Sequence, residues 1–288
     1  MLKPYLPPTY RADAGDVTVA TVVHVESTGH QEERRRSVDE TRWVVSQTFG
    51  PHAVGTDGLP ELGALVVHVD PRFDDAAAIL DEHLAVSPLV RGVRCVAAHH
   101  PDPGVRDFTD HPHLLSDPAF LSGFAAIAER DLGFEIWCYA HQLPDALTLV
   151  REYPDTTFVL DHYGSPVGLT GPRGRHTGRT EAERTSMLGA WRDDVAALAE
   201  HPNVVAKHSG LGMPVLGSDV VDPDRVAPLI RHLHDVFGPD RTLWASNFPM
   251  DKANHTLPAS LRLVTAVLGS DADLEKLVRD VATRVYRL

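Results

Sequence analysis

The chain has little of three features that would assign it to other protein classes. It has 2 cysteines in 288 residues, and because both lie inside apolar runs we interpret Cys95 and Cys138 as buried thiols rather than as a disulfide or a nucleophile. It shows no signal peptide and no membrane-length apolar run. Its 27 basic residues are outnumbered by 40 acidic ones, which argues against a nucleic-acid partner, since phosphate binding needs clustered Lys and Arg. We therefore expect a cytoplasmic globular protein without a membrane partner.

Seven apolar runs read as buried strands, because strands of a parallel sheet are covered on both faces. These runs are Val19–Glu26, Gly63–Asp70, Gly92–Ala97, Phe134–Ala140, Thr157–His162, Val204–Ser209 and Thr242–Asn247. Helical patterns occur at Ser37–Thr48, Ala76–Val86, Pro118–Arg130, Pro144–Glu152, Glu181–Glu200, Asp224–Phe237 and Asp271–Leu288. No glycine fingerprint follows the first strand, which argues against a dinucleotide-binding fold. The alternation predicts an α/β fold of the (β/α)8 TIM-barrel type, with seven strands visible and the first strand of a complete barrel missing.

Two segments do not fit the repeating unit. Residues 1–18 are proline-rich, and we expect them to be irregular. Residues 164–180 are rich in Gly, Arg and Thr and are too long for an average connection. We expect this second segment to be a functional loop over the barrel mouth.

Polar residues stand at the carboxyl ends of the predicted strands, where α/β barrels place their chemistry. The most informative case is Thr157–Pro166, where an apolar strand ends abruptly in Asp161 and His162. A polar pair at the end of such an apolar run must either form hydrogen bonds or have a functional role. Comparable positions elsewhere carry Arg94, His99, His100, Tyr139, His141, Lys207, His208, Asn247 and Asp251. Such a ring can bind an anionic or hydroxylated small molecule, move a proton and polarise a carbonyl.

Several of these residues have an equally good structural interpretation. His99 and His100 open a loop that they could simply cap, and His141 could start the next helix. Asp251 fits a helical or loop role as well as a catalytic one. We interpret the tryptophans as packing residues.

Four motifs in this order resemble the amidohydrolase superfamily, and within it the amidohydrolase-2 type, which contains lactone hydrolases. They are Val90–Arg94, Leu160–Gly164, Asn203–Leu211 and Phe237–Pro249. The similarity runs from about Pro4 to Leu288. It implies a single amidohydrolase-like barrel domain over residues 1–288, with the active site at the carboxyl ends of the strands. Related barrels often form dimers, so the resemblance also allows a homodimer.

The resemblance also implies one divalent metal, with zinc the first choice. Related proteins hold it with a His-x-His pair on the first strand, histidines on middle strands and an Asp on the last. His141 and His162 match the middle-strand histidines, and Asn247 stands where the Asp would be. The visible sequence lacks the family's first strand and the His-x-His pair on it. The only comparable cluster, His111-Pro112-His113, is expected in a loop. Either the start of the chain was placed too far downstream or the barrel lacks this strand, and a metal-free enzyme is then the alternative.

These observations predict a hydrolase that acts on a lactone or a related carbonyl ester. His162, or a nearby carboxylate such as Asp251, would be the base, with Asn247 beside it. Substrate binding is assigned to the remaining strand-end residues, which are Arg94, Tyr139, His141, Lys207, His208, His99 and His100. Two alternatives stay open: a metal-dependent non-oxidative decarboxylase of an aromatic or enoic acid, and an incomplete or inactive barrel that binds a ligand or partner.

Overall fold

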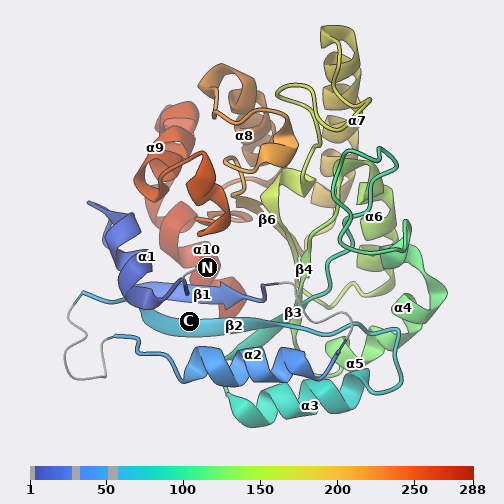
Figure 1. Cartoon of the computed structure of the whole chain (residues 1–288), viewed down its shortest axis with the longest axis vertical. Coiled ribbons are helices and arrows are strands. Elements are labelled where there is room, and N and C mark those ends of the chain that lie inside the picture. Colours follow the sequence, from blue (N-terminus) through green and yellow to red (C-terminus); the bar gives the residue numbers. More distant parts are fainter. Residues whose placement is uncertain (1–3, 28–32, 51–57) are drawn as a thin grey trace.

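The computed structural model describes residues 4–27, 33–50 and 58–288. These residues form one seven-stranded parallel sheet in which neighbours in sequence are neighbours in the sheet, in the order β1 to β7. The sheet curls into an open half-barrel with helices around its outer face (Figure 1). Its strands are β1 (Thr21–Val25), β2 (Glu61–His68), β3 (Val90–Arg94), β4 (Gly133–Ile136), β5 (Phe158–Leu160), β6 (Val204–His208) and β7 (Thr242–Trp244). All seven predicted strands are confirmed.

The helices follow the strands around the sheet. They are α1 (Pro7–Ala14), α2 (Arg36–Val45), α3 (Ala76–Val86), α4 (Pro118–Gly123), α5 (Ala125–Ala128), α6 (Leu143–Glu152), α7 (Glu181–Ala199), α8 (Pro223–Phe237), α9 (Leu257–Leu268) and α10 (Val281–Tyr286). Within the described ranges, none of them has the length and apolar character needed to cross a membrane.

Two helices correct the sequence expectations. The segment expected to be irregular contains α1, which starts at Pro7; a proline suits the first helical turn because its ring fixes φ and no N–H is needed there. Helix α9 was not predicted. It is capped by Thr256, whose hydroxyl oxygen accepts from the Ala259 amide at 3.3 Å, a start signal that the sequence does carry.

Alternation along each strand separates an outer apolar layer from the inside of the curl. In β4, Phe134 and Ile136 join the large core under the helices, whereas Glu135 between them points the other way. The thiols of Cys95 and Cys138 lie at buried positions in the outer core, and neither forms a disulfide, as predicted.

The C-terminal helix covers the inside of the open sheet. Val281 and Tyr286 of the last helix, α10, form a small core with Ala64 of β2, Val205 of β6 and Leu243 of β7. Strands β1 and β7 are the two edges of the described sheet, and an open edge has unpaired backbone groups that need cover. Helix α10 therefore fills space between the first and last strands and carries Tyr286 into the interior.

Candidate active site at the carboxyl ends of the strands

Five buried charged side chains form what we call the inner ion network: Glu26, Arg94, Glu135, Asp161 and Lys207. The Arg94 guanidinium donates from Nε to Glu26 Oε1 at 2.7 Å and from Nη1 to Asp161 Oδ2 at 3.1 Å. The Lys207 Nζ lies 2.5 Å from Glu135 Oε2 and 2.9 Å from Asp161 Oδ1. Two cations thus share three carboxylates, and Arg94 also donates from Nη2 to the backbone carbonyl of Glu26.

Tyr286 completes this network from the C-terminal helix. Its hydroxyl donates to Glu135 Oε1 at 2.6 Å. Burial and the charge of Asp161 raise the pKa of Glu135 to about 7, against the opposing pull of Lys207 and Arg94. Burial alone would also raise the pKa of Asp161, but Lys207, His162 and Arg94 outweigh it and hold that pKa below its ordinary value.

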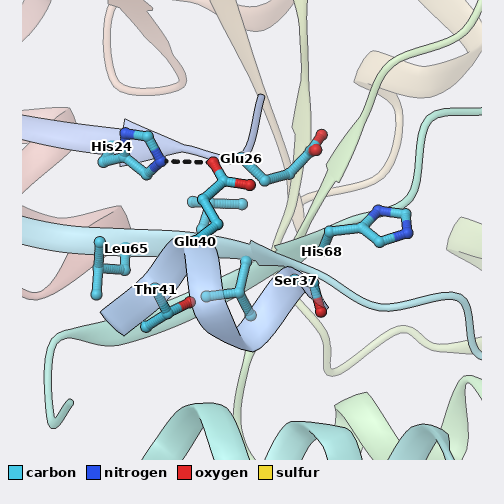
Figure 2. Close-up of a pocket in the computed structure, with 9 residues that line it drawn as sticks. His24, Glu26, Ser37, Glu40, Thr41, Leu65 and His68 are labelled. Atoms are coloured by element: carbon cyan, nitrogen blue, oxygen red, sulfur yellow. Dashed lines mark hydrogen bonds and ion pairs between the residues drawn. The ribbon is translucent and has the colours of Figure 1, made fainter. Parts of the chain in front are cut away.

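A cavity next to Glu26 is too small for a substrate. Its volume is about 10 Å³, which is room for about one water molecule. Figure 2 shows it between β1, β2 and α2, where the His24 ring faces Glu40 at 3.0 Å and Glu26 extends from the end of β1. His68 also lines this cavity, and its Nδ1 lies 3.2 Å from the carbonyl oxygen of Arg94. These histidines and acids therefore hold the strand ends together.

His162 lies just after the end of β5 and shares a neighbour, Trp137, with Arg94. Its Nδ1 is 2.8 Å from the Ser209 hydroxyl, and its ring meets the Trp137 ring edge-on with centroids 5.9 Å apart. The Arg94 guanidinium lies 4.9 Å from the centroid of the same tryptophan. Burial, with help from Arg94 and Lys207, lowers the pKa of His162 to about 4 although Asp161 opposes this. The imidazole is therefore neutral at pH 7, and no described residue forms a hydrogen bond with its Nε2.

Asn247 and Asp251 lie together after β7. The Asn247 side chain donates from Nδ2 to Asp251 Oδ1 at 2.8 Å. Asp251 is fully buried, and burial raises its pKa to about 7, while Asn247 and the amides of Gly210 and Gly212 act in the opposite direction. A carboxyl group with this pKa exchanges its proton near neutral pH, as a general base or acid requires.

The segment after β6 separates His162 from Asp251. A Cβ atom built on Gly210 would lie 2.8 Å from His162 Cγ, and one built on Gly212 would lie 3.0 Å from Asp251 Cβ. Glycine is needed here because any side chain would push these two groups apart. The ends of β5, β6 and β7 thus bring His162, Ser209 and the Asn247–Asp251 pair to one place.

The backbone is strained at the same strand ends. His162, Tyr163 and Ser165 have φ values of 52°, 57° and 43°, and Asn247 has a φ of 50°. Non-glycine residues rarely adopt this left-handed region, and such strain clusters at functional sites. These left-handed conformations turn the chain sharply away from the sheet and leave the His162 and Asn247 side chains at the barrel mouth.

The structure places His208 apart from the other strand-end candidates. It follows Lys207 on β6, so it points to the opposite face of the sheet. There its Nδ1 meets the Tyr163 hydroxyl at 3.0 Å. Burial, together with nearby His234, lowers its pKa to about 3.

The remaining predicted residues form a second cluster, beyond the ends of β3 and β4. The His100 ring lies edge-on to His141 at 5.0 Å and to Tyr139 at 5.7 Å, between centroids. His99 Nδ1 lies 3.2 Å from the Thr109 carbonyl oxygen, and the Tyr139 hydroxyl donates to the Arg106 carbonyl at 2.6 Å. His141 is exposed, whereas His99 and His100 are half-buried.

With this geometry in view, comparison with known proteins identifies the family. The family model described as Amidohydrolase matches residues 19–288. The chain belongs to the amidohydrolase family. This confirms the family and the hydrolase class inferred from the four motifs.

Individual relatives are more distant. An uncharacterized protein of Sinorhizobium fredii is 30% identical over 87% of this chain and 74% of its own length. An L-fucono-1,5-lactonase of Burkholderia ambifaria is 31% identical over 66% of this chain and 57% of its own length, so the match spans little more than half of that lactonase. A crystal structure of an amidohydrolase from Burkholderia multivorans, with bound HEPES, superimposes with a TM-score of 0.75 at 20% identity, covering 99% of this chain and 89% of that one. The last comparison supports the barrel fold.

The metal candidates of this amidohydrolase lie in different clusters. His162 packs against Trp137 and Ser209, whereas His141 packs against His100. In the part of the chain that the structure describes, no group of three or more His, Cys, Asp or Glu residues is arranged to hold a metal ion. An amidohydrolase structure from Burkholderia multivorans does contain zinc. The described residues do not fit such a site, and no step proposed below passes through a metal.

Sequence reasoning missed several residues that shape this site. Ser209 was included in the sixth strand but not in the site, and Trp137 was interpreted only as packing. Glu135 carries a usable signal, because a single acid inside the apolar run of β4 points inward by its two-residue period. Tyr286 carries none, since nothing in its own segment indicates a partner 151 residues away.

Proposed function

We propose that this amidohydrolase opens a sugar-type lactone or a related cyclic ester to the corresponding hydroxy acid. The observation that carries this proposal is that a neutral imidazole, His162, and a carboxyl group of pKa about 7, Asp251, pack against the same short segment, at Gly210 and Gly212. The name of the Burkholderia ambifaria relative, an L-fucono-1,5-lactonase, supports the same reaction class.

In this mechanism Asp251 is the general base. Its carboxylate removes a proton from water while the water oxygen bonds to the lactone carbonyl carbon. When the resulting tetrahedral intermediate collapses, the bond to the ring oxygen breaks and the same carboxyl group returns the proton to that oxygen. The Asn247 amide holds Oδ1 at 2.8 Å, which orients the carboxylate for both transfers.

His162 is the group that stabilises the oxyanion. If the Ser209 hydroxyl donates to Nδ1, the proton of the neutral ring is on Nε2, where it can be donated to the carbonyl oxygen as negative charge develops. A neutral imidazole suits this role because its protonation state does not change near neutral pH. Ser209 and Trp137 fix the ring through its Nδ1 and one edge.

We assign Arg94 and Lys207 a supporting role beneath the mouth. Both were expected to bind a substrate carboxylate or the oxyanion directly, but their donors are bound to Glu26, Glu135 and Asp161. Their charges also lower the pKa of His162. Direct substrate binding by either cation would require breaking a buried ion pair, which costs several kcal/mol.

The proposal is tested with L-fucono-1,5-lactone and other sugar lactones, with acid release followed by pH-stat titration. We expect turnover by the wild type and a loss of about 100-fold or more in kcat for Asp251→Asn, because the amide cannot accept the proton. The matched control is Asp155→Asn, at an exposed position beyond α6, which should retain wild-type kinetics. Full activity of Asp251→Asn would remove this residue from the mechanism.

The same assay addresses the alternatives and the metal. Carbon dioxide release without net acid formation would favour a decarboxylase, and a folded protein with no activity toward any lactone or acid would favour a binding protein. Protein treated with a chelator, and protein then supplied with zinc, are assayed side by side with metal analysis. Activity that appears only with zinc would show that residues other than those assigned here complete the site.

A further inference from the structure

The side chains of the proposed reaction centre are buried. Asp251 is 0% exposed, Ser209 1% and His162 6%. A lactone must come within hydrogen-bond distance of a proton donor and of a water held by the base before it can be opened. It cannot do so while these groups are covered, so part of the structure must move before the substrate binds.

Three loops cover the reaction centre with an apolar cluster, which we call the roof cluster. It consists of Val96, Ala98, Trp137 and Tyr139 from just beyond β3 and β4, Val105 and Phe108 from the loop after β3, Val167 from the loop after β5, and Val215 from the loop after β6. The Trp137 ring lies 5.9 Å from the His162 ring, between centroids, so the roof cluster packs directly on the centre. The loop after β5 is residues 164–180, which were expected to lie over the mouth.

One carboxylate, that of Asp102 in the loop after β3, holds residues 164–180 in place. Its two oxygens accept five hydrogen bonds at 2.7 to 3.0 Å, from the amides of Gly104, Arg175, His176 and Thr177 and from the Thr177 hydroxyl. A Cβ atom built on Gly174 would lie 2.5 Å from Asp102 Oδ2, so the close approach of the two loops requires glycine there. Hydrogen bonds to an ionised acceptor are the stronger kind, and this side chain therefore fastens one loop to the other.

The same loop is also joined to the segment that supports the reaction centre. The amides of Gly168 and Thr170 donate, at 3.0 and 2.8 Å, to carbonyl oxygens within residues 210–217. Glycines of that segment pack against His162 and Asp251. A movement of the loop therefore also changes the packing around these two groups.

We propose that residues 164–180 form a lid over the reaction centre and that Asp102 is the latch that holds this lid closed. The inference rests on the proposed function for what passes under the lid. The substrate enters when the latch opens, and closure then excludes water and restores the packing around His162 and Asp251. Because Asp102 acts through the lid, it is a positioning residue and not a catalytic one.

The first experiment measures hydrogen exchange by mass spectrometry and does not depend on turnover. In the wild type, we expect lid amides to exchange about 100-fold or more faster than those of β5 and β6, because the lid opens without global unfolding. In Asp102→Asn, an NH2 group replaces one acceptor oxygen and faces backbone N–H donors. The amides of Gly168 and Thr170, whose acceptors lie in residues 210–217, should then exchange about 10-fold faster still, the value of a hydrogen bond to a charged group.

The matched control is Asp107→Asn, in the same loop as Asp102. Asp107 accepts the amide of His100 at 2.7 Å, and its substitution should leave lid exchange at the wild-type rate. Lid amides that exchange as slowly as the strands in the wild type would overturn the proposal. So would faster exchange confined to residues 175–177 in Asp102→Asn, or a rise that is equally large in β5 and β6, which would assign Asp102 to the stability of the whole fold.

The second experiment measures the kinetics of lactone opening. We expect Asp102→Asn to raise KM by about 10-fold, with a smaller change in kcat, because the closed state that binds the substrate is less populated. Asp251→Asn should instead lose kcat, and Asp107→Asn should match the wild type. An unchanged KM for Asp102→Asn would overturn the latch even if lactones are hydrolysed. If no lactone is hydrolysed, the proposed function fails and the exchange experiment alone decides whether the lid exists.

Discussion

Two buried aspartates at the strand ends, Asp161 and Asp251, have carboxyl pKa values shifted in opposite directions, although neither is exposed to solvent. Asp161 belongs to the inner ion network and has two cations beside it, which hold its pKa below the ordinary value. Asp251 has only an amide side chain and backbone amides, and its pKa rises to about 7. Burial disfavours the charged form in both cases, so the neighbouring charge decides the outcome. The two cations of the inner network thus keep Asp161 ionised, whereas Asp251, which has no cation beside it among the described residues, can exchange a proton near neutral pH.

The largest effect should come from removing a cation from the inner network. Arg94→Met removes the cation that binds both Glu26 and Asp161 and leaves Asp161 with Lys207, so we expect the free energy of unfolding to fall by about 3–5 kcal/mol. Urea denaturation of purified protein measures this. Arg151→Met should stay within about 0.5 kcal/mol of wild type. A loss below about 1 kcal/mol for Arg94→Met would mean that the network contributes little.

A change at the mouth should affect activity instead of stability. His162→Asn removes the imidazole but keeps a residue that tolerates the left-handed backbone at φ 52°. We expect kcat for lactone opening to fall by about 100- to 1000-fold, as for other lost oxyanion donors, while urea denaturation shows a smaller change than for Arg94→Met. Near-normal kcat would refute the assigned role, and a collapse of the fold would place His162 with the structural network.

The last prediction, a pH dependence, sharpens the comparison between the two aspartates. The pKa of Asp251 is raised from 3.8 to about 7 in the folded protein, so between these values the folded state holds a proton that the unfolded chain releases. Stability contributed by this proton is therefore present at low pH and is lost as pH rises through this range. We expect the free energy of unfolding of Asp251→Asn, relative to wild type, to increase from pH 4 to pH 7. A difference that does not vary with pH would contradict the raised pKa.

The sequence predicted the sheet well because buried parallel strands leave a signal that needs no tertiary information. An apolar run of strand length between helical patterns is enough, and all seven runs became neighbouring strands in chain order. The abrupt end of the run at Asp161 and His162 also marked the end of β5, whose last residue is Leu160. Helix α1 was not predicted, because proline, here Pro7, occurs in the first turn of helices but also breaks them.

The distribution of polar residues between the two faces was harder to predict. Lys207 and His208 are adjacent, and a shift of one residue in register exchanges their faces; only the structure shows that Lys207 lies inside and His208 outside. The sequence also suggested that Arg94 and Lys207 face the substrate, whereas both are bound to buried acids. Such pairings depend on which distant strands become neighbours, and local pattern does not encode this.

The hydrogen bond from Tyr286 to Glu135 joins residues 151 positions apart, and it has a consequence for how the protein folds. A partly assembled sheet would contain carboxylates in apolar surroundings before their cations and the phenol had arrived, which is energetically unfavourable. Sub-structures built from only the first four or five strands should therefore be scarcely populated. We expect equilibrium unfolding to be a single cooperative transition, seen alike by tryptophan fluorescence and circular dichroism.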